Sequence, residues 1–161
     1  GKHAAIFAQE NNHSQLDETL INSLINQSLE AFARSEGENP YQLQYDLQEM
    51  MQDLVGIVRR EDEMTRALAG IGKFQERAAR VGVIGHREYN PGWHTCLDLP
   101  NLLCVSEAVA KCALDRRESR GGHFRGDYPR HDPAAARSRN TLAEADALAA
   151  SLSPVALAVN G

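Results

Sequence analysis

The chain has 161 residues, enough for one domain of ordinary size with a single hydrophobic core. A formal net charge of −5 argues against a broad nucleic-acid-binding surface, which needs clustered Lys and Arg. Aromatic residues make up only 6% of the chain, which favours helices packed through aliphatic side chains over a β-sandwich.

The N-terminal residues predict helices. Gly1 to Ala8 read as the middle of a helix without an initiator methionine, so we expect a fragment of a longer polypeptide. Ser14, three residues before Asp17, is a partial capping signal for the next helix, which we expect to end by Gly37. The apolar stripe of that helix has roughly helical spacing and comprises Leu16, Leu20, Ile21, Leu24, Ile25, Leu29 and Phe32.

The Asn39-Pro40 pair predicts the start of the first long helix, because proline at the first helical position has no hydrogen bond to lose. A narrow apolar seam follows at spacings of three and four, at Leu43, Leu47, Met50, Leu54 and Ile57. We expect Met50 and Met51 to be core residues rather than a ligand site. Gly56 is expected inside this helix, where glycine costs about 1 kcal/mol relative to alanine and a close helix crossing would explain it.

The next two long helices are expected at about Glu61 to Val81 and Leu99 to Asp115. The first has its apolar positions at Met64, Leu68, Ile71, Phe74, Ala78 and Val81. A loop rich in Gly and Pro separates the two helices, and we expect Tyr89 and Trp93 to anchor it on the bundle. Pro100 should either start the last helix or kink it.

These segments predict an all-α fold, an up-and-down antiparallel three-helix bundle (spectrin-repeat-like) with an additional N-terminal helix and an extended C-terminal segment. The core is expected to contain Leu47, Leu54, Ile71, Phe74, Leu103 and Val109. Residues 133–140 form a basic linker, and residues 141–152 form an alanine-rich helical stretch. Residues 153–161 are a strand, a frayed tail or a cloning remnant.

The usual metal and dinucleotide patterns are missing from the sequence. Cys96, Cys104 and Cys112 are odd in number, and their spacing fits no zinc or iron–sulfur pattern, so we expect buried, reduced thiols in a cytosolic protein. His86 and His94 are poorly placed for a shared metal across a Gly-Pro loop. No Gly-x-Gly-x-x-Gly follows a strand, so we expect no dinucleotide site in this chain.

A charged run from Arg117 to Pro129 follows the last helix directly. Arg116 and Arg117 are expected in its last turn, where cations complement the helix dipole. The Gly121-Gly122 pair is expected to form a left-handed cap at the helix C-terminus. Pro129 favours an extended conformation at Tyr128. The helix should therefore break sharply into an extended, charged segment.

Arg117 through Asp132 read Arg-Glu-Ser-Arg-Gly-x-His-x-Arg-x-Asp-Tyr-Pro-x-x-Asp when Gly122 is taken as variable. This pattern resembles the signature near the C-terminus of succinate dehydrogenase and fumarate reductase flavoprotein subunits. L-aspartate oxidase is similar but usually lacks the second arginine, here Arg125. The resemblance covers about residues 39–132, fades after Asp132, and includes Leu47 to Met51 and Val55 to Arg59. Residues 2–9 resemble the end of the last FAD-domain helix.

The resemblance implies a parent that interconverts succinate and fumarate on FAD and passes electrons to an iron–sulfur subunit, in electron transport and the tricarboxylic acid cycle. For this chain it implies a docking and scaffolding module without catalytic, cofactor-binding or metal residues of its own. The partners would be the FAD domain of the same polypeptide and the iron–sulfur subunit, with no nucleic acid and no direct membrane insertion. The parent would be cytoplasmic, peripheral to the inner face of the cell membrane. Alternatives are L-aspartate oxidase, adenylylsulfate reductase and a freestanding helical interaction module.

By the resemblance, residues 1–13 end an FAD-domain helix, 14–118 form the bundle domain, 119–133 the signature segment and 134–161 a tail. In an extended segment His123 and Arg125 point to the same side. With Arg120 they either clamp the bundle to the flavin domain, which we favour, or support the dicarboxylate site. The candidate interdomain residues are Arg117, Glu118, Ser119, Arg120, Gly121, His123, Arg125 and Asp127.

Overall fold

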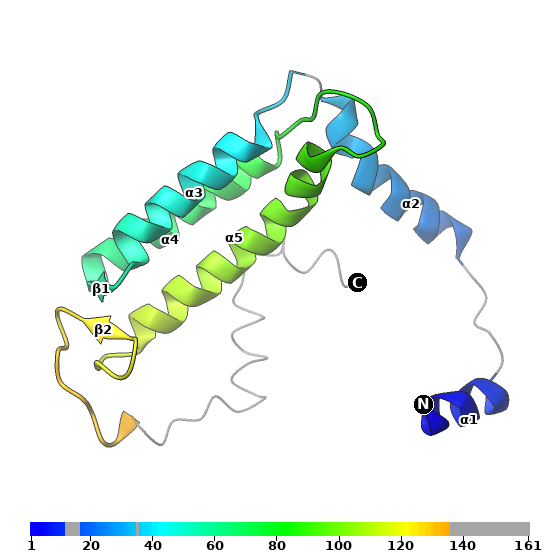
Figure 1. The fold of residues 1–161 in the computed structure, drawn as a ribbon. Coiled ribbons are helices and arrows are strands. Elements are labelled where there is room, and N and C mark those ends of the chain that lie inside the picture. The colour runs from blue at the N-terminus through cyan, green and yellow to red at the C-terminus, as the bar shows by residue number, and fades with distance from the viewer. Residues whose placement is uncertain (12–16, 35, 136–161) are drawn as a thin grey trace. The chain divides into compact units, whose positions relative to one another are not determined.

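A computed structural model describes residues 1–11, 17–34 and 36–135. The chain divides into two units, Gly1–Glu30 and Ala31–Gly161. The helices are α1 (Lys2–Glu10), α2 (Glu18–Leu29), the short 3-10 helix η1 (Glu30–Ala33), α3 (Pro40–Val55), α4 (Glu61–Ala78) and α5 (Pro91–Asp115). The strands, β1 (Val58–Arg59) and β2 (Phe124–Arg125), have two residues each. The predicted all-α fold is confirmed (Figure 1).

The first unit consists of α1 and α2, and α1 confirms the expected helix at the start of the chain. Asp17 caps α2, since its carboxylate accepts hydrogen bonds from the backbone N–H groups of Thr19 and Leu20 at 2.9 and 3.1 Å. Ser14, the expected capping residue, lies outside the described residues. The regular helix ends at Leu29 and is followed by the 3-10 helix η1, before the predicted limit of Gly37.

Helix α3 starts where Asn39-Pro40 predicted, with the Asn39 side chain accepting from the backbone N–H of Tyr41 at 2.9 Å. It ends at Val55, so the prediction of Gly56 inside the helix is wrong. Gly56 is the C-terminal cap, and Ile57, expected on the apolar seam, is 79% exposed. The chain turns here into β1 instead of continuing the seam.

Helix α5 begins at Pro91 rather than Leu99 because Asn90 caps it, accepting from the backbone N–H of Trp93 at 3.1 Å. Pro100 therefore lies inside the helix and does not start it. The expected role of Tyr89 as a loop anchor is wrong, since this residue is 99% exposed. Helix α4 ends at Ala78, before the predicted Val81.

Helices α3, α4 and α5 pack against one another in pairs and confirm the predicted bundle (Figure 1). Of the predicted core residues, Leu47, Ile71, Phe74 and Leu103 are buried together, and Leu54 packs against them. Val109 is 42% exposed, so its placement in the core is wrong, because it lies on the other side of α5. Met50, Met51 and Trp93 are partly buried against the core, as predicted for the two methionines.

The three cysteines are free thiols on α5. Cys96 is buried, and burial raises the pKa of its thiol. Cys104 is half-buried and Cys112 is exposed, so the expectation of buried thiols holds only in part. Within the described part of the chain, no helix is both long enough and apolar enough to cross a membrane.

Candidate functional site

The signature segment returns to the bundle through a two-stranded parallel ribbon. Strand β1 pairs with β2, with Val58 opposite Phe124 and Arg59 opposite Arg125. The ribbon places the segment after α5 beside the end of α3 and the start of α4 (Figure 1). The side chains gathered here, which we call the end cluster, are Arg59, Glu61, Glu118, Ser119, Arg120, His123, Arg125 and Asp127.

Arg125 is fully buried and caps the C-terminus of α5. Its Nη1 donates to the carbonyl oxygens of Ala113 at 3.0 Å, Leu114 at 2.8 Å and Arg116 at 3.2 Å. The last carbonyl groups of a helix have no partner within the helix, so the guanidinium supplies one. Its plane also lies over the Tyr128 ring, with 4.9 Å from Cζ to the ring centroid.

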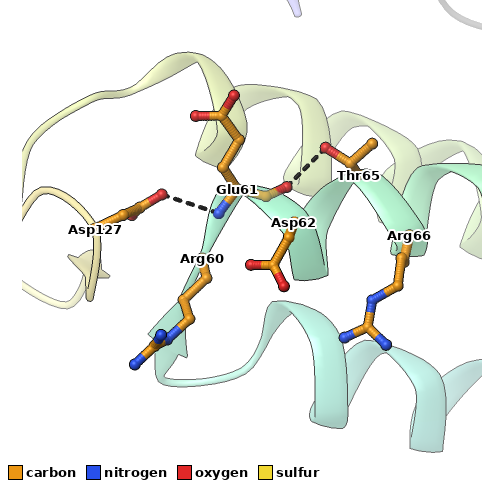
Figure 2. Close-up of a pocket in the computed structure, with 6 residues that line it drawn as sticks. All are labelled: Arg60, Glu61, Asp62, Thr65, Arg66 and Asp127. Carbon is orange, nitrogen blue, oxygen red and sulfur yellow. Dashed lines mark hydrogen bonds between the residues drawn. The ribbon is translucent and has the colours of Figure 1, made fainter.

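Asp127 neutralises Arg125 and reaches the start of α4. Its carboxylate accepts a bidentate pair from Nε and Nη2 of Arg125, both at 2.7 Å. Oδ2 also accepts from the backbone N–H of Glu61 at 3.0 Å, where Arg60 supplies no side-chain cap (Figure 2). These hydrogen bonds hold the pKa of Asp127 far below its usual range, the contact with Arg125 being the larger cause.

Arg59 caps a third helix end, the C-terminus of α3. Its Nε donates to the carbonyl oxygens of Val55 at 3.1 Å and Gly56 at 3.0 Å, at the C-terminus of α3. Its Nη1 lies 2.8 Å from Nδ1 of His123. Because a guanidinium only donates, Nδ1 must accept, and Nε2 of His123 donates to the Arg116 carbonyl at 3.3 Å. His123 is therefore neutral, and burial lowers its pKa.

Glu118, also fully buried, holds the far end of the segment. Its carboxylate accepts from Nε and Nη2 of Arg120 at 3.0 and 3.1 Å and from the backbone N–H of Asp132 at 2.9 Å. These bonds, the Arg120 contact first, lower the pKa of Glu118 to about 2. The hydroxyl of Ser119 accepts from the backbone N–H of Arg125 at 2.9 Å and donates to the Tyr128 carbonyl at 2.8 Å.

Two local expectations for this segment are wrong. Helix α5 ends at Asp115 and Arg116 is its extended cap residue, so neither Arg116 nor Arg117 lies in the last turn. Gly121 does have a left-handed φ of +58°, but in a tight turn beyond the helix end. There Arg120 and His123 exchange backbone hydrogen bonds at 2.8 and 3.0 Å. The helix end is capped by Arg125 instead of by the glycines.

The predicted site residues separate into two groups. Glu118, Ser119, Arg120, His123, Arg125 and Asp127 join in the end cluster, and His123 and Arg125 lie on one side, both reaching the Arg116 carbonyl. Arg117 and Gly121 are exposed, and Arg117 has no side-chain hydrogen bond or ion pair among the described residues. Sequence reasoning missed Arg59 and Glu61, although Val55 to Arg59 already resembled the family.

An open groove runs beside the cluster, lined by Arg60, Glu61, Asp62, Thr65, Arg66 and Asp127 (Figure 2). Its charges are mixed, so it offers no field of one sign to a phosphate or a dicarboxylate. Among the described residues there is no group of three or more His, Cys, Asp or Glu that could hold a metal ion.

An FAD molecule does not fit what the described residues offer. A dinucleotide site needs a strand that leads through a glycine-rich turn into a helix, whose N-terminus holds the pyrophosphate. The described strands have two residues each, and no Gly-x-Gly-x-x-Gly follows either of them. The described residues therefore form no dinucleotide site of this kind.

A family model described as fumarate reductase flavoprotein C-term matches residues 44–158. The match continues past Asp132, so the expectation that the resemblance fades there is wrong. The succinate dehydrogenase flavoprotein subunit of Coxiella burnetii is 37% identical over 98 residues, covering 60% of this chain and 17% of the relative. The L-aspartate oxidase of Yersinia pestis is 36% identical over 88 residues, covering 53% and 15%.

A solved structure shows the same fold. A chain in the Mycobacterium smegmatis Sdh1 complex in the apo form matches with a TM-score of 0.73 and 43% identity, over 82% of this chain and 23% of that chain. The present chain spans about a fifth of the length of the curated relatives it matches, for example 23%, 17% and 21%.

Proposed function

Because this chain belongs to the family of C-terminal domains of fumarate reductase and succinate dehydrogenase flavoprotein subunits, we propose that it serves an FAD-dependent subunit that interconverts succinate and fumarate. In this proposal the domain itself is a docking and scaffolding module without an active site of its own. The FAD belongs to the rest of the same polypeptide. The further partner is an iron–sulfur subunit, and the parent lies in the cytoplasm against the inner face of the cell membrane.

The observation that carries a scaffolding role is how the end cluster uses its charges. Arg125 and Glu118, the buried charged residues of the described chain, are both bonded to groups of the same domain. A group that binds substrate must keep a donor free for it, whereas Nε, Nη1 and Nη2 of Arg125 are all engaged. This supports a structural role for the signature over direct chemistry.

We propose that the two groups of signature residues divide the interdomain role. Arg117 and the turn at Gly121 are exposed and free to contact the flavin domain. The cluster residues Glu118, Ser119, Arg120, His123, Arg125 and Asp127 form the brace behind them. The brace holds Arg117 and the Gly121 turn in position, so it affects docking without contacting the partner itself.

L-aspartate oxidase is the second candidate, favoured by the Yersinia pestis relative, which is 36% identical over 88 residues. In that case the parent would take an amino acid as its substrate. Arg125 favours a parent that interconverts succinate and fumarate, because L-aspartate oxidase usually lacks an arginine at this position.

The test uses the longer polypeptide that contains this chain, purified with its flavin. We expect succinate-dependent reduction of an artificial electron acceptor and fumarate-dependent oxidation of a reduced dye, without oxidation of L-aspartate. Oxidation of L-aspartate alone would establish the second candidate. Absence of bound FAD and of all three activities would point to a freestanding interaction module. The 161-residue chain by itself is expected to show no flavin absorption band.

A further inference from the structure

The ring of His123 attaches the tight turn of residues 120–123 to the end of another helix. Its Nδ1 accepts from Nη1 of Arg59 at 2.8 Å, and its Nε2 donates to the Arg116 carbonyl at 3.3 Å. The bond to Arg59 is the stronger of the two, because it is shorter and its donor is charged. Arg59 lies in β1 and also caps α3. This one ring therefore connects the turn to the C-terminus of α3.

This attachment requires a neutral imidazole. A proton on Nδ1 would replace the acceptor by a donor that faces the guanidinium of Arg59, which can only donate. Three cations act on the ring, namely Arg59 from β1, Arg116 after α5 and Arg125 from β2. Burial is the largest cause of the lowered pKa of His123, and these three cations lower that pKa further. A protonated ring is therefore disfavoured in its present position.

The carboxylates of the end cluster are bonded to arginines. Asp127 and Glu61 both face Arg125, at 2.7 and 3.8 Å from its Nη2. Glu118 accepts from Nε and Nη2 of Arg120 at 3.0 and 3.1 Å. Within the part of the chain that the structure describes, none of these three carboxylates is bonded to the imidazole. A protonated ring would thus have no counter-charge of its own here.

The turn is held on both sides by ion pairs that mild acid leaves intact, which we call the flanking pairs. Before the turn, Arg120 pairs with Glu118, and the contact lowers the pKa of Glu118 to about 2. After the turn, Arg125 pairs with Asp127 and holds its pKa far below the usual range. Both carboxylates stay charged at the pH of about 5 to 7 at which histidines usually titrate. Only the residues between the flanking pairs can then respond to protonation.

The turn can move without disturbing the core. Gly121 and Gly122 are exposed, and a Cβ at either position would meet no atom within 4 Å. Adjacent glycines accept large changes of φ and ψ, so they provide a hinge. The turn is closed by the two backbone hydrogen bonds between Arg120 and His123, at 2.8 and 3.0 Å.

We propose that His123 is an acid-sensitive latch on this turn. When Nδ1 takes a proton from solvent, the bond to Arg59 breaks, the ring leaves the Arg116 carbonyl, and residues 121–123 become mobile. The flanking pairs and the three long helices stay in place. Under the proposed function, the latch makes the contact of this turn with the flavin domain sensitive to acid. The latch itself depends only on contacts within this domain.

NMR spectroscopy of the isotope-labelled 161-residue chain tests the latch between about pH 7.5 and pH 4.5. At the higher pH, the ring should carry its proton on Nε2, and the backbone order parameters of Gly121 and Gly122 should be about 0.85. As the ring titrates, below the ordinary histidine value of about 6.5, these order parameters should fall below about 0.6. Arg125 and Asp132, whose amides bond to Ser119 and Glu118, should stay rigid.

Two variants separate His123 from other groups that titrate. His123→Gln keeps an oxygen acceptor for Arg59 but takes up no proton, so the turn should stay ordered at both pH values. His131→Gln is the matched control, because it replaces an exposed histidine of the same segment. This control should lose order in the turn as the parent does.

Titration of the His123 ring without a change in the order parameters of the turn would overturn the inference. A turn that is already mobile at the higher pH would also overturn it. So would a joint loss of order at Gly121 and Arg125, which would mean unfolding beyond the turn. A mobile turn in His123→Gln at the lower pH would assign the response to another group. The proposed function fails on separate evidence, the absence of FAD and of succinate and fumarate turnover in the longer polypeptide.

Discussion

Arg125 has no solvent contact, and its donors serve the C-terminus of α5 and the carboxylate of Asp127. Arg125→Ala should therefore lower the free energy of unfolding by roughly 2–4 kcal/mol, because buried carbonyl groups lose their partner. Urea unfolding of the chain measures this loss. Arg117→Ala, at an exposed position whose side chain has no hydrogen bond or ion pair with a described residue, should change the free energy by no more than about 0.5 kcal/mol. Equal midpoints for the two variants would contradict the capping role.

His123 links the stability of the end cluster to pH. Its folded pKa is lowered by burial, so the folded state binds a proton less readily than the unfolded state. The stability that it contributes is full above the unfolded pKa of about 6.5 and is lost as the pH falls through the folded pKa. The lowered pKa of Glu118, about 2 against 4.5, acts in a separate and more acidic window.

Replacing His123 tests this linkage. His123→Gln should flatten the loss of stability between about pH 7 and pH 5, measured as the urea midpoint at each pH. His86→Gln, at an exposed loop position, should keep the pH dependence of the parent. Parallel curves for the parent and His123→Gln would show that another group titrates in this range.

Among the elements, the connection after α4 requires glycine at position 82, because the backbone there lies close to the backbone of Arg34. A Cβ on Gly82 would lie 1.7 Å from the backbone oxygen of Arg34, which no rotation of a side chain can relieve. Gly82→Ala should destabilise the chain by about 1–3 kcal/mol. Gly72, inside α4 with no atom within 4 Å of a Cβ, is the matched control. Gly72→Ala should stabilise by up to about 1 kcal/mol, so the thermal midpoints should shift in opposite directions.

The two sides of α5 should respond differently to truncation in the short chain. Leu103 is 2% exposed in the core, so Leu103→Ala should cost about 2–5 kcal/mol in urea unfolding. Val109 is 42% exposed, so Val109→Ala should cost no more than about 0.5 kcal/mol. A large loss at Val109 would mean that its side chain is more deeply buried in solution than its exposed fraction indicates.

The helices could be predicted from local signals where those signals agreed with one another. Asn39-Pro40 marked the start of α3 because a cap and a proline were followed by the apolar seam. Asn90-Pro91 is the same signal at the start of α5, but together with Gly92 it is also typical of a loop, and the prediction assigned it to the connection. Packing of α5 against α3 and α4 sustains the helix through Pro100, and no local pattern contains that tertiary contribution.

The site could be predicted only in part, for a related reason. The residue types of the signature were conspicuous in the sequence. The burial of two of them could not be predicted, since a charged run is usually exposed to solvent. Arg125 and Glu118 are buried because each meets its counter-charge within two residues and helix ends or backbone groups complete their bonding. Arg59 and Glu61 approach the cluster from much earlier in the chain. Such pairings come from the tertiary fold, which local spacing does not encode.

For the whole molecule, the brace should matter more to docking than to turnover. In the longer polypeptide, Arg120→Ala and Arg125→Ala should lower flavin retention and thermal stability, because the surface that they support becomes misplaced. Turnover per bound flavin should stay near normal. Arg66→Ala, at an exposed position on α4, is the control. A drop of about a hundredfold at full flavin occupancy, near 2.7 kcal/mol, would assign these arginines to chemistry instead.

Residues from the C-terminal part of the chain cap helix ends of the bundle, and this determines when folding of the domain can be completed during synthesis. Arg59 and His123 are 64 residues apart, and Glu61 and Asp127 are 66 apart. During synthesis α3 and α4 leave the ribosome first, and the N-terminus of α4 lacks its cap until Asp127 emerges. Contacts of such long sequence separation form late. A nascent chain stopped at Asp115 would contain all three long helices and still lack Asp127 and Arg125, which cap the N-terminus of α4 and the C-terminus of α5, so quality control could distinguish it from a finished domain.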